Sequence, residues 1–482
     1  MNDAESNSGG PRPGGGVLAN LVILHFSSLL IFTAWAFGGQ APWVRQVIAG
    51  WGAVGVLLFI IGCATRAKSA GGDASWPALR HLWPLWLYDL LVGASCFNPS
   101  FRETVIAGQP VLVQGDPVWW LPGAARPLMA WKELWQFNVI VLTCFNLCLV
   151  LPRRRLVRTV LFVMAGNAVV LAVFGTFQKL VHADGLWFGL VPSPNPRFFS
   201  TFIYHNHCGA FTLLNTAAGL GLLFHFLRRG GQRDIWHSPV PLGVVATLLL
   251  ATSVPLSASR SCTVLTALLL FGALTHFLAR LIRRRRERHE SALLPAAGIV
   301  LAALLAAGAI AWLSRDVIAQ RARLTSQQVT RLAQEDTLNS RLTLYRDTWR
   351  MAAAKPVFGW GLESYAHVFR IYNSQRPVER WFDVPFYAEA HNDWLQSLAE
   401  VGFTGTGLLA LLLLGPLLSV PWRRVSSVLP RYLLAGAAIV LLYAWVEFPF
   451  ANPAVMLTFC ASVACAVRYA ALDVRDQPPE PR

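Results

Sequence analysis

The long apolar runs of this chain, and the arginines between them, restrict its fold more than any other feature. A bilayer-spanning helix needs about 20 mostly apolar residues, and about twelve stretches of the chain meet that need. We expect these spans at 17–38, 46–64, 79–97, 132–151, 156–178, 204–227, 239–257, 261–282, 293–313, 402–420, 431–448 and 453–468. Only 14% of the residues are charged, against roughly 25% in a soluble domain. An all-α integral membrane protein is therefore predicted.

The gaps between these spans alternate in charge. The gaps after even-numbered spans are basic, as at 153–155 and 283–286, whereas the short odd gaps contain almost no Lys or Arg. Because cytoplasmic loops of membrane proteins accumulate Lys and Arg, both termini and the basic gaps are predicted to be cytoplasmic. The same rule accounts for the net charge of +16, so binding of nucleic acid is not favoured.

One odd gap is long and polar. Residues 314–401 hold ten of the 25 acidic residues of the chain, and we expect this block to be a large, partly helical periplasmic loop with a catalytic role. The remaining divisions are a disordered cytoplasmic N-terminus, a membrane domain in two parts, and a cytoplasmic tail. They cover residues 1–16, 17–313, 402–468 and 469–482.

Two helices are predicted inside the polar block. The first runs over 337–353, with Leu342 and Tyr345 on one stripe and Asn339 or Ser340 as its cap. The second begins near His391 and ends at Gly402, where the chain turns into the tenth span.

Two outward-facing arginines are the sharpest candidates for a site. Arg260 lies between two apolar runs with almost no loop, and Arg197 precedes the run that begins near Tyr204. An arginine at the membrane edge is costly unless it pairs or binds something. The alternative for Arg260 is a side chain that snorkels from a tight outer turn. Nearby, Asn206 would allow hydrogen bonding to a ligand, and Gly209 would allow close backbone approach.

The polar block adds further candidates. Arg341, Arg346 and Arg350 lie on its first helix, where they form either a guanidinium cluster for a diphosphate or a solvated face paired with Asp347. His391 is the natural base, because an ordinary histidine titrates near neutral pH.

His391 has polar neighbours that would orient or tune it. These neighbours are Glu389, Asn392, Asp393 and Glu400. By contrast, His205 and His207 are two residues apart and diverge on a helix, so a metal site is not favoured there.

A tryptophan-rich gap at 98–131 allows two interpretations. Its Trp residues form either an interfacial aromatic belt or a platform on which a sugar or lipid headgroup stacks.

The order of these motifs resembles that of the O-antigen ligase and polymerase family, over residues from about 190 to 450. The resemblance is carried by Arg-Phe-Phe-Ser-Thr-Phe at 197–202 with Asn206 and Gly209, Ser259-Arg260, Pro-Val-Phe-Gly-Trp-Gly at 356–361, and His-Asn-Asp-Trp-Leu at 391–395 followed by Glu400, Gly402 and Gly405. Phe198-Phe199 and the Trp-rich gap depart from the family pattern, which leaves the acceptor open.

The resemblance implies a glycosyltransferase of the bacterial inner membrane with about twelve spans. Such a protein moves a glycan from undecaprenyl diphosphate to a hydroxyl on the periplasmic side, with no nucleotide sugar and no metal. By residue match, Arg197 and Arg260 would contact the diphosphate, and His391 would be the catalytic base. Asn206, Arg341, Asn392 and Glu400 would help to bind substrate. One direct displacement would invert the anomeric centre.

Several acceptors and activities stay open. The acceptor is lipid A-core or another hydroxyl in a ligase, a second lipid-linked repeat in a polymerase, and a protein in an O-oligosaccharyltransferase. A transporter of lipid-linked sugars is a further alternative, although it would be expected to carry charges near mid-span. A metal-dependent transferase would have to use Glu103 and Asp116, which lack Asp-x-Asp spacing.

Overall fold

The computed structural model describes residues 13–69, 79–106, 109–229, 237–317, 319, 337–374 and 387–477. Within these residues, each of the twelve expected spans contains a helix. These helices are α1 (Pro13–Trp35), α2 (Pro42–Ser69), α4 (Trp83–Cys96), α5 (Pro127–Val150), α6 (Arg154–Leu180), α7 (His205–Arg229), α8 (Val240–Leu256), α9 (Arg260–Glu287), α10 (Leu293–Leu313), α14 (Asp393–Leu418), α15 (Leu429–Tyr443) and α16 (Pro453–Arg475).

Helix length separates these twelve into two groups. In the described part of the chain, nine are long and apolar enough to cross a membrane. The other three are shorter: α4 has 14 residues, α8 has 17 and α15 has 15. The chain is thus an α-helical integral membrane protein, as predicted, while the number of twelve crossings stays a prediction.

The remaining elements lie outside these twelve helices. They are the two strands β1 (Phe101–Ile106) and β2 (Gln109–Gln114), the helices α12 (Thr337–Ala354) and α13 (Tyr365–Tyr372), and the 3₁₀ turns η1 (Phe37–Gly39), η2 (Arg80–Leu82), η3 (Trp187–Gly189), η4 (Trp422–Arg424) and η5 (Pro449–Ala451). The strands form an antiparallel hairpin in the Trp-rich gap. The sequence did not predict this hairpin.

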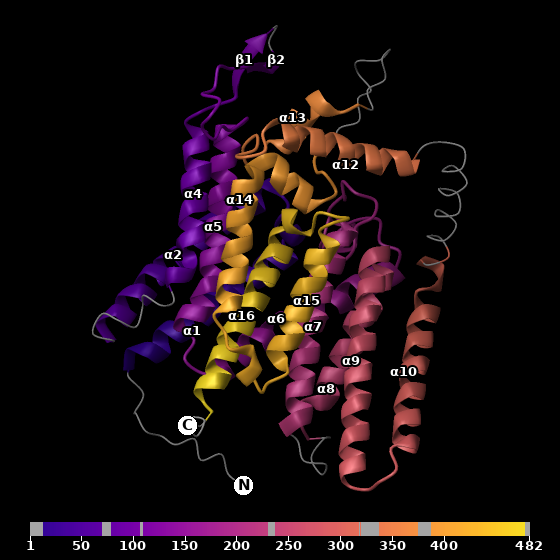
Figure 1. Cartoon of the computed structure of the whole chain (residues 1–482). Coiled ribbons are helices and arrows are strands. Elements are labelled where there is room, and N and C mark those ends of the chain that lie inside the picture. Colours follow the sequence, from indigo (N-terminus) through magenta and orange to yellow (C-terminus); the bar gives the residue numbers. More distant parts are fainter. Residues whose placement is uncertain are drawn as a thin grey trace.

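The long helices lie side by side as one bundle with two different ends (Figure 1). The hairpin, α12 and α13 gather at one end, here called the loop end. At the opposite end, here called the terminal end, α1 begins and α16 finishes (Figure 1). Both described ends of the chain thus lie on one side, as an even number of crossings requires.

The basic gaps meet at the terminal end. Arg154, which opens α6, forms an ion pair of 2.6 Å with Asp473 near the end of α16. Arg228 of α7 donates a hydrogen bond to the carbonyl of Ser426, in the gap before α15. Three of the arginine-rich gaps therefore lie at the same end of the bundle, as expected if all basic gaps face one side of the membrane.

The bundle is packed densely at its centre and loosely at one edge. In the apolar stretch of α7, 78% of the residues are buried, and in α16 the value is 72%, whereas none is buried in α10. In a membrane protein such an uncovered helix is expected to face lipid. The core that supports the site therefore centres on α7 and α16.

The two helices expected in the polar block are present. The first, α12, begins at Thr337, so Asn339 and Ser340 lie inside it and the expected cap was wrong. The second is the first part of α14, which Gly402 separates from the membrane-embedded part with φ 64°. A side chain at Gly402 would strike the carbonyl of Val357. Only glycine accepts both that conformation and that contact.

Candidate active site

A buried carboxylate at the loop end contacts polar side chains from three other parts of the chain. Glu447 follows α15 and is 6% exposed. Its Oε1 accepts hydrogen bonds from Asn206 Nδ2 at 3.0 Å and from Arg341 Nη2 at 3.5 Å. Its Oε2 accepts one from the Tyr204 hydroxyl and faces Nδ1 of His391, each at 3.4 Å. These five residues are called the Glu447 cluster below.

The backbone around His391 holds the imidazole in place. His391 has φ 52°, a conformation uncommon for residues other than glycine. The carbonyl of His391 accepts a hydrogen bond from the Tyr345 hydroxyl at 3.0 Å. Two residues later, the Asp393 amide donates to the carbonyl of Ala444 at 2.9 Å. The edge of the His391 ring packs on Phe448, with 4.8 Å between ring centres. His391 is thus fixed from α12 on one side and from the end of α15 on the other.

The pairing with Glu447 gives the two imidazole nitrogens of His391 different roles. When Nδ1 carries its proton, it points that proton at the carboxylate, so Nε2 keeps its lone pair and can accept a proton. The side chain of His391 is 30% exposed. A general base needs this combination of a fixed ring and an accessible nitrogen.

Two tyrosines serve the cluster as hydrogen-bond donors. Burial, and then the negative charge of Glu447, raises the pKa of Tyr204 above its ordinary value. Burial is also the largest cause that raises the pKa of Tyr345. Both phenols therefore stay protonated at neutral pH and donate, one to the carboxylate and one to the carbonyl of His391.

The three arginines that were predicted to act on the substrate, Arg197, Arg260 and Arg341, are all exposed. Arg341 contacts Glu447 directly, and 55% of its side chain is exposed. Arg197 is exposed, and its carbonyl accepts a hydrogen bond from the His205 amide at the start of α7. Arg260 is exposed at the start of α9.

The starts of α7 and α9 pack against each other beside the cluster. The Cys262 thiol donates to the carbonyl of Asn206 at 3.8 Å, and Gly209 leaves room for Cys262, whose Cβ would be 2.7 Å from an added side chain. The fold therefore brings the beginnings of both arginine-bearing segments to the loop end.

Two predicted substrate-binding residues have structural partners instead. Asn392 caps α14, with its Oδ1 accepting from the Leu395 amide at 3.0 Å. Glu400 accepts from the amides of Glu363 and Tyr365, both at 3.1 Å, and so holds the loop before α13. These bonds give both side chains a positioning role in the fold, and a role in substrate binding stays a prediction.

The other polar neighbours of His391 also bond elsewhere. Glu389 accepts from Gln396 Nε2 at 2.7 Å, and Asp393 accepts from the Phe450 amide at 3.0 Å. The carboxylate that contacts the His391 ring is Glu447, and tuning of His391 by its sequence neighbours stays a prediction. Among the residues that the structure describes, no group of three or more His, Cys, Asp or Glu side chains is placed to hold a metal ion.

Three members of this site were not predicted from the sequence: Glu447, Tyr204 and Tyr345. One signal was present, because Glu447 lies at the end of the apolar run 431–448, where an ionisable residue is costly and often functional. The tyrosines gave no signal, since aromatic residues are common at membrane interfaces. On α12, Arg350 pairs with Asp347 at 3.5 Å, as the alternative of a solvated face predicted.

Fold and cluster together define an integral membrane protein with a hydrogen-bonded polar site at one end of its helix bundle. Residues 245–410 match the model of the family described as O-antigen ligase, which supports the family that the sequence motifs predicted. No curated protein matches the chain. The matched region contains Arg260, Arg341 and His391, whereas Asn206 and Glu447 lie outside it. The family indicates a ligase- or polymerase-like function that uses a lipid-linked glycan donor and an acceptor.

Proposed function

We propose that this protein transfers a glycan from undecaprenyl diphosphate to a hydroxyl of an acceptor, in the manner of an O-antigen ligase. We place the loop end in the periplasm, because the basic gaps contact the terminal end and positive loops stay in the cytoplasm. The observation that carries the proposal is the contact of 3.4 Å between His391 and Glu447, at the edge of a site that exposes arginine.

The reaction we propose is one displacement. Nε2 of His391 takes the proton of the acceptor hydroxyl while that oxygen forms a bond to the anomeric carbon of the donor. The bond between that carbon and the diphosphate oxygen breaks, and undecaprenyl diphosphate leaves with the electron pair. Attack from the opposite face inverts the anomeric centre. Glu447 balances the positive charge that develops on the imidazole.

The arginines would stabilise the leaving group. A guanidinium keeps its charge and binds two phosphate oxygens at once, so Arg197 and Arg260 can offset the charge that grows on the diphosphate. Arg341 touches Glu447 at 3.5 Å and is half exposed. We propose that it turns between the carboxylate and the diphosphate, which couples donor binding to the base.

The direct test is transfer by purified protein carrying His391→Ala. Loss of a general base lowers the rate by roughly 10²–10⁴-fold, with donor binding unchanged. His182→Asn is the matched control, because His182 is an exposed loop histidine that also has a positive φ. Near-normal transfer by the His391 variant would refute the proposal.

The acceptor class is tested by deletion in the native host. Accumulated lipid-linked donor together with unextended acceptor would support the ligase. Surface molecules capped by single repeats would instead show a polymerase, and this result would overturn the proposed acceptor while leaving the His391 chemistry intact.

A further inference from the structure

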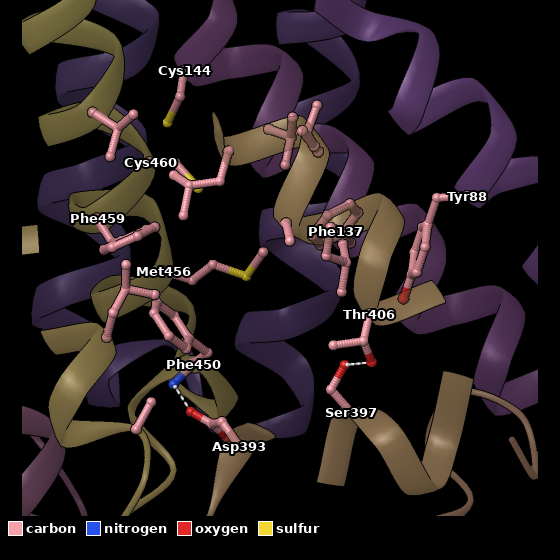
Figure 2. A pocket seen from close by; sticks show the side chains of 18 of the residues that line it. Tyr88, Phe137, Cys144, Asp393, Ser397, Thr406, Phe450, Met456, Phe459 and Cys460 are labelled. Atoms are coloured by element: carbon pink, nitrogen blue, oxygen red, sulfur yellow. Dashed lines mark hydrogen bonds between the residues drawn. The ribbon is translucent and has the colours of Figure 1, made fainter. Parts of the chain in front are cut away.

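A second, larger feature lies behind the Glu447 cluster: a cavity of about 500 Å³ between α5, α14 and α16. Figure 2 shows apolar and sulfur-bearing side chains on one side of the cavity, and Tyr88 with the hydrogen-bonded pair Ser397 and Thr406 on the other. The apolar and sulfur-bearing lining includes Phe137, Cys144, Met456, Phe459 and Cys460. Helix α14 packs on α4 and α12 at its flanks, and the cavity separates it from α5 and α16.

The cavity follows almost the whole length of α14. Its lining includes Asp393 at the first residue of that helix and Ser419 just after its last. The membrane-embedded part of α14 follows the break at Gly402 and covers 403–418, which is about 24 Å at about 1.5 Å per residue. This part spans most of the roughly 30 Å hydrocarbon core of a bilayer. The shape of the cavity therefore suits one or two extended hydrocarbon chains, and its apolar wall excludes a polar ligand from the middle.

The rim of the cavity at the loop end is acidic. Five carboxyl groups line it, against the single guanidinium of Arg45, which pairs with Glu133 at 2.8 Å. The five are Glu133, Glu363, Glu389, Asp393 and Glu400. Among the described residues that line this rim, a diphosphate would meet one guanidinium, already paired with Glu133, and carboxyl groups that carry no positive charge in either protonation state. Sugar hydroxyls, in contrast, donate hydrogen bonds to carboxylates, and the rim also contains the indole of Trp394 on which a sugar ring can stack.

The cavity and the Glu447 cluster share one wall. Glu389 and Asp393 line the cavity, and His391 lies between them in the sequence with its ring toward Glu447. Likewise Ala444 and Phe450 line the cavity on either side of Glu447. A head group at the acidic rim would therefore lie next to the segment that carries the base.

From this placement we propose that the cavity binds the hydrocarbon anchor of the acceptor, and that the acceptor is a glycolipid whose sugar nearest the lipid carries no phosphate. The donor diphosphate is then held on the arginine side of the wall. This inference rests on the proposed transferase function, and it names the acceptor class of that same site.

Blocking the cavity tests the inference. Cys460→Trp places a large ring in the apolar middle, and Val264→Trp, on the exposed surface of α9, is the matched control. Transfer is measured with an undecaprenyl-diphosphate-linked glycan as donor and two acceptors, a dialkyl glycolipid and its soluble head alone. We expect the KM for the tailed acceptor to rise about tenfold in Cys460→Trp only, with the KM values for the donor and for the soluble head unchanged.

Two results would overturn the inference. A rise in the donor KM would assign the cavity to the polyprenyl chain, and equal rises for both acceptors would exclude a tail site. Absence of transfer by the unaltered protein to either acceptor would instead count against the transferase function itself.

Labelling of the unaltered protein does not depend on the folding of a variant. A dialkyl glycolipid with a photoreactive group in its chain should label α5, α14 or α16, and an excess of the unlabelled glycolipid should compete. Labels confined to α9 and α10 would contradict the inference. A matched probe with a phosphate on its first sugar should label less, and equal or stronger labelling would refute the uncharged head.

Discussion

The Glu447 cluster and the cavity lie on two sides of one wall but differ in every physical property. In the cluster, one buried carboxylate is surrounded by donors, including a guanidinium and an imidazole. In the cavity, apolar side chains form the body and carboxyl groups form the rim. One side thus suits an anion and proton transfer, and the other suits a hydrocarbon chain with an uncharged head. A base placed between two such compartments can serve two amphiphilic substrates that must meet only at their reacting atoms.

The largest effect that would test this division is expected at Glu447. Glu447→Gln keeps the size of the side chain but removes the charge that orients His391, so we expect kcat to fall by about 10³-fold. Steady-state transfer rates measure this. Glu290→Gln, a change at an exposed ion pair with Arg285, is the control. A loss below about threefold would remove Glu447 from the mechanism.

Arg260 is expected to have the next largest effect. Arg260→Lys should lower transfer by about 10²-fold, nearly as much as Arg260→Ala, because lysine lacks the planar fork that holds two phosphate oxygens. With a donor analogue that carries one phosphate, the difference in transfer rate between the unaltered protein and the two Arg260 variants should be smaller. If the lysine variant transfers normally, the role of Arg260 in holding the diphosphate is wrong.

A smaller effect is expected at Tyr345, which supports His391 through its carbonyl. Tyr345→Phe removes one hydrogen bond, worth about 1 kcal/mol, and we expect kcat to fall roughly fivefold with the donor KM unchanged. Tyr372→Phe, on α13, is the control. Equal losses in both variants would point to a general weakening of the loop end.

The smallest effect concerns the cavity rim and pH. Burial raises the pKa of Glu389 from 4.5 to about 7. Because the pKa is higher in the folded state, the stability that protonated Glu389 contributes is greatest below pH 4.5 and is lost as pH rises to about 7. We therefore expect Glu389→Gln to raise the unfolding temperature above that of the unaltered protein by more at pH 8 than at pH 5. A difference that does not change with pH would contradict the raised pKa.

Much of the fold was predictable from local sequence. All twelve expected spans contain helices, α12 lies within a residue of its expected end, and Gly402 breaks α14 where predicted. Apolar length and glycine placement act over a few residues, so they can be recognised without the fold. The β1–β2 hairpin was missed because its strands are short and precede the tryptophans that suggested an interfacial belt for this gap.

The site was predictable only in part. His391 and Arg341 were identified, and the structure places both on one carboxylate. The sequence neighbours Asn392 and Glu400 were assigned to substrate, but their hydrogen bonds hold backbone amides. Adjacency along the chain was a poor guide here, because a helix start turns neighbouring side chains in different directions.

The sequence by itself determined the membrane-embedded helices, the end of the bundle to which the arginine-rich gaps belong, and the likeness of residues 245–410 to the O-antigen ligase family. Only the tertiary structure decided which carboxylate faces His391, and that a lipid-sized cavity lies behind it. The physical reason is one of range. Burial of an apolar run depends on its own composition, whereas a contact between His391 and Glu447 depends on how the segment before α14 meets the segment after α15.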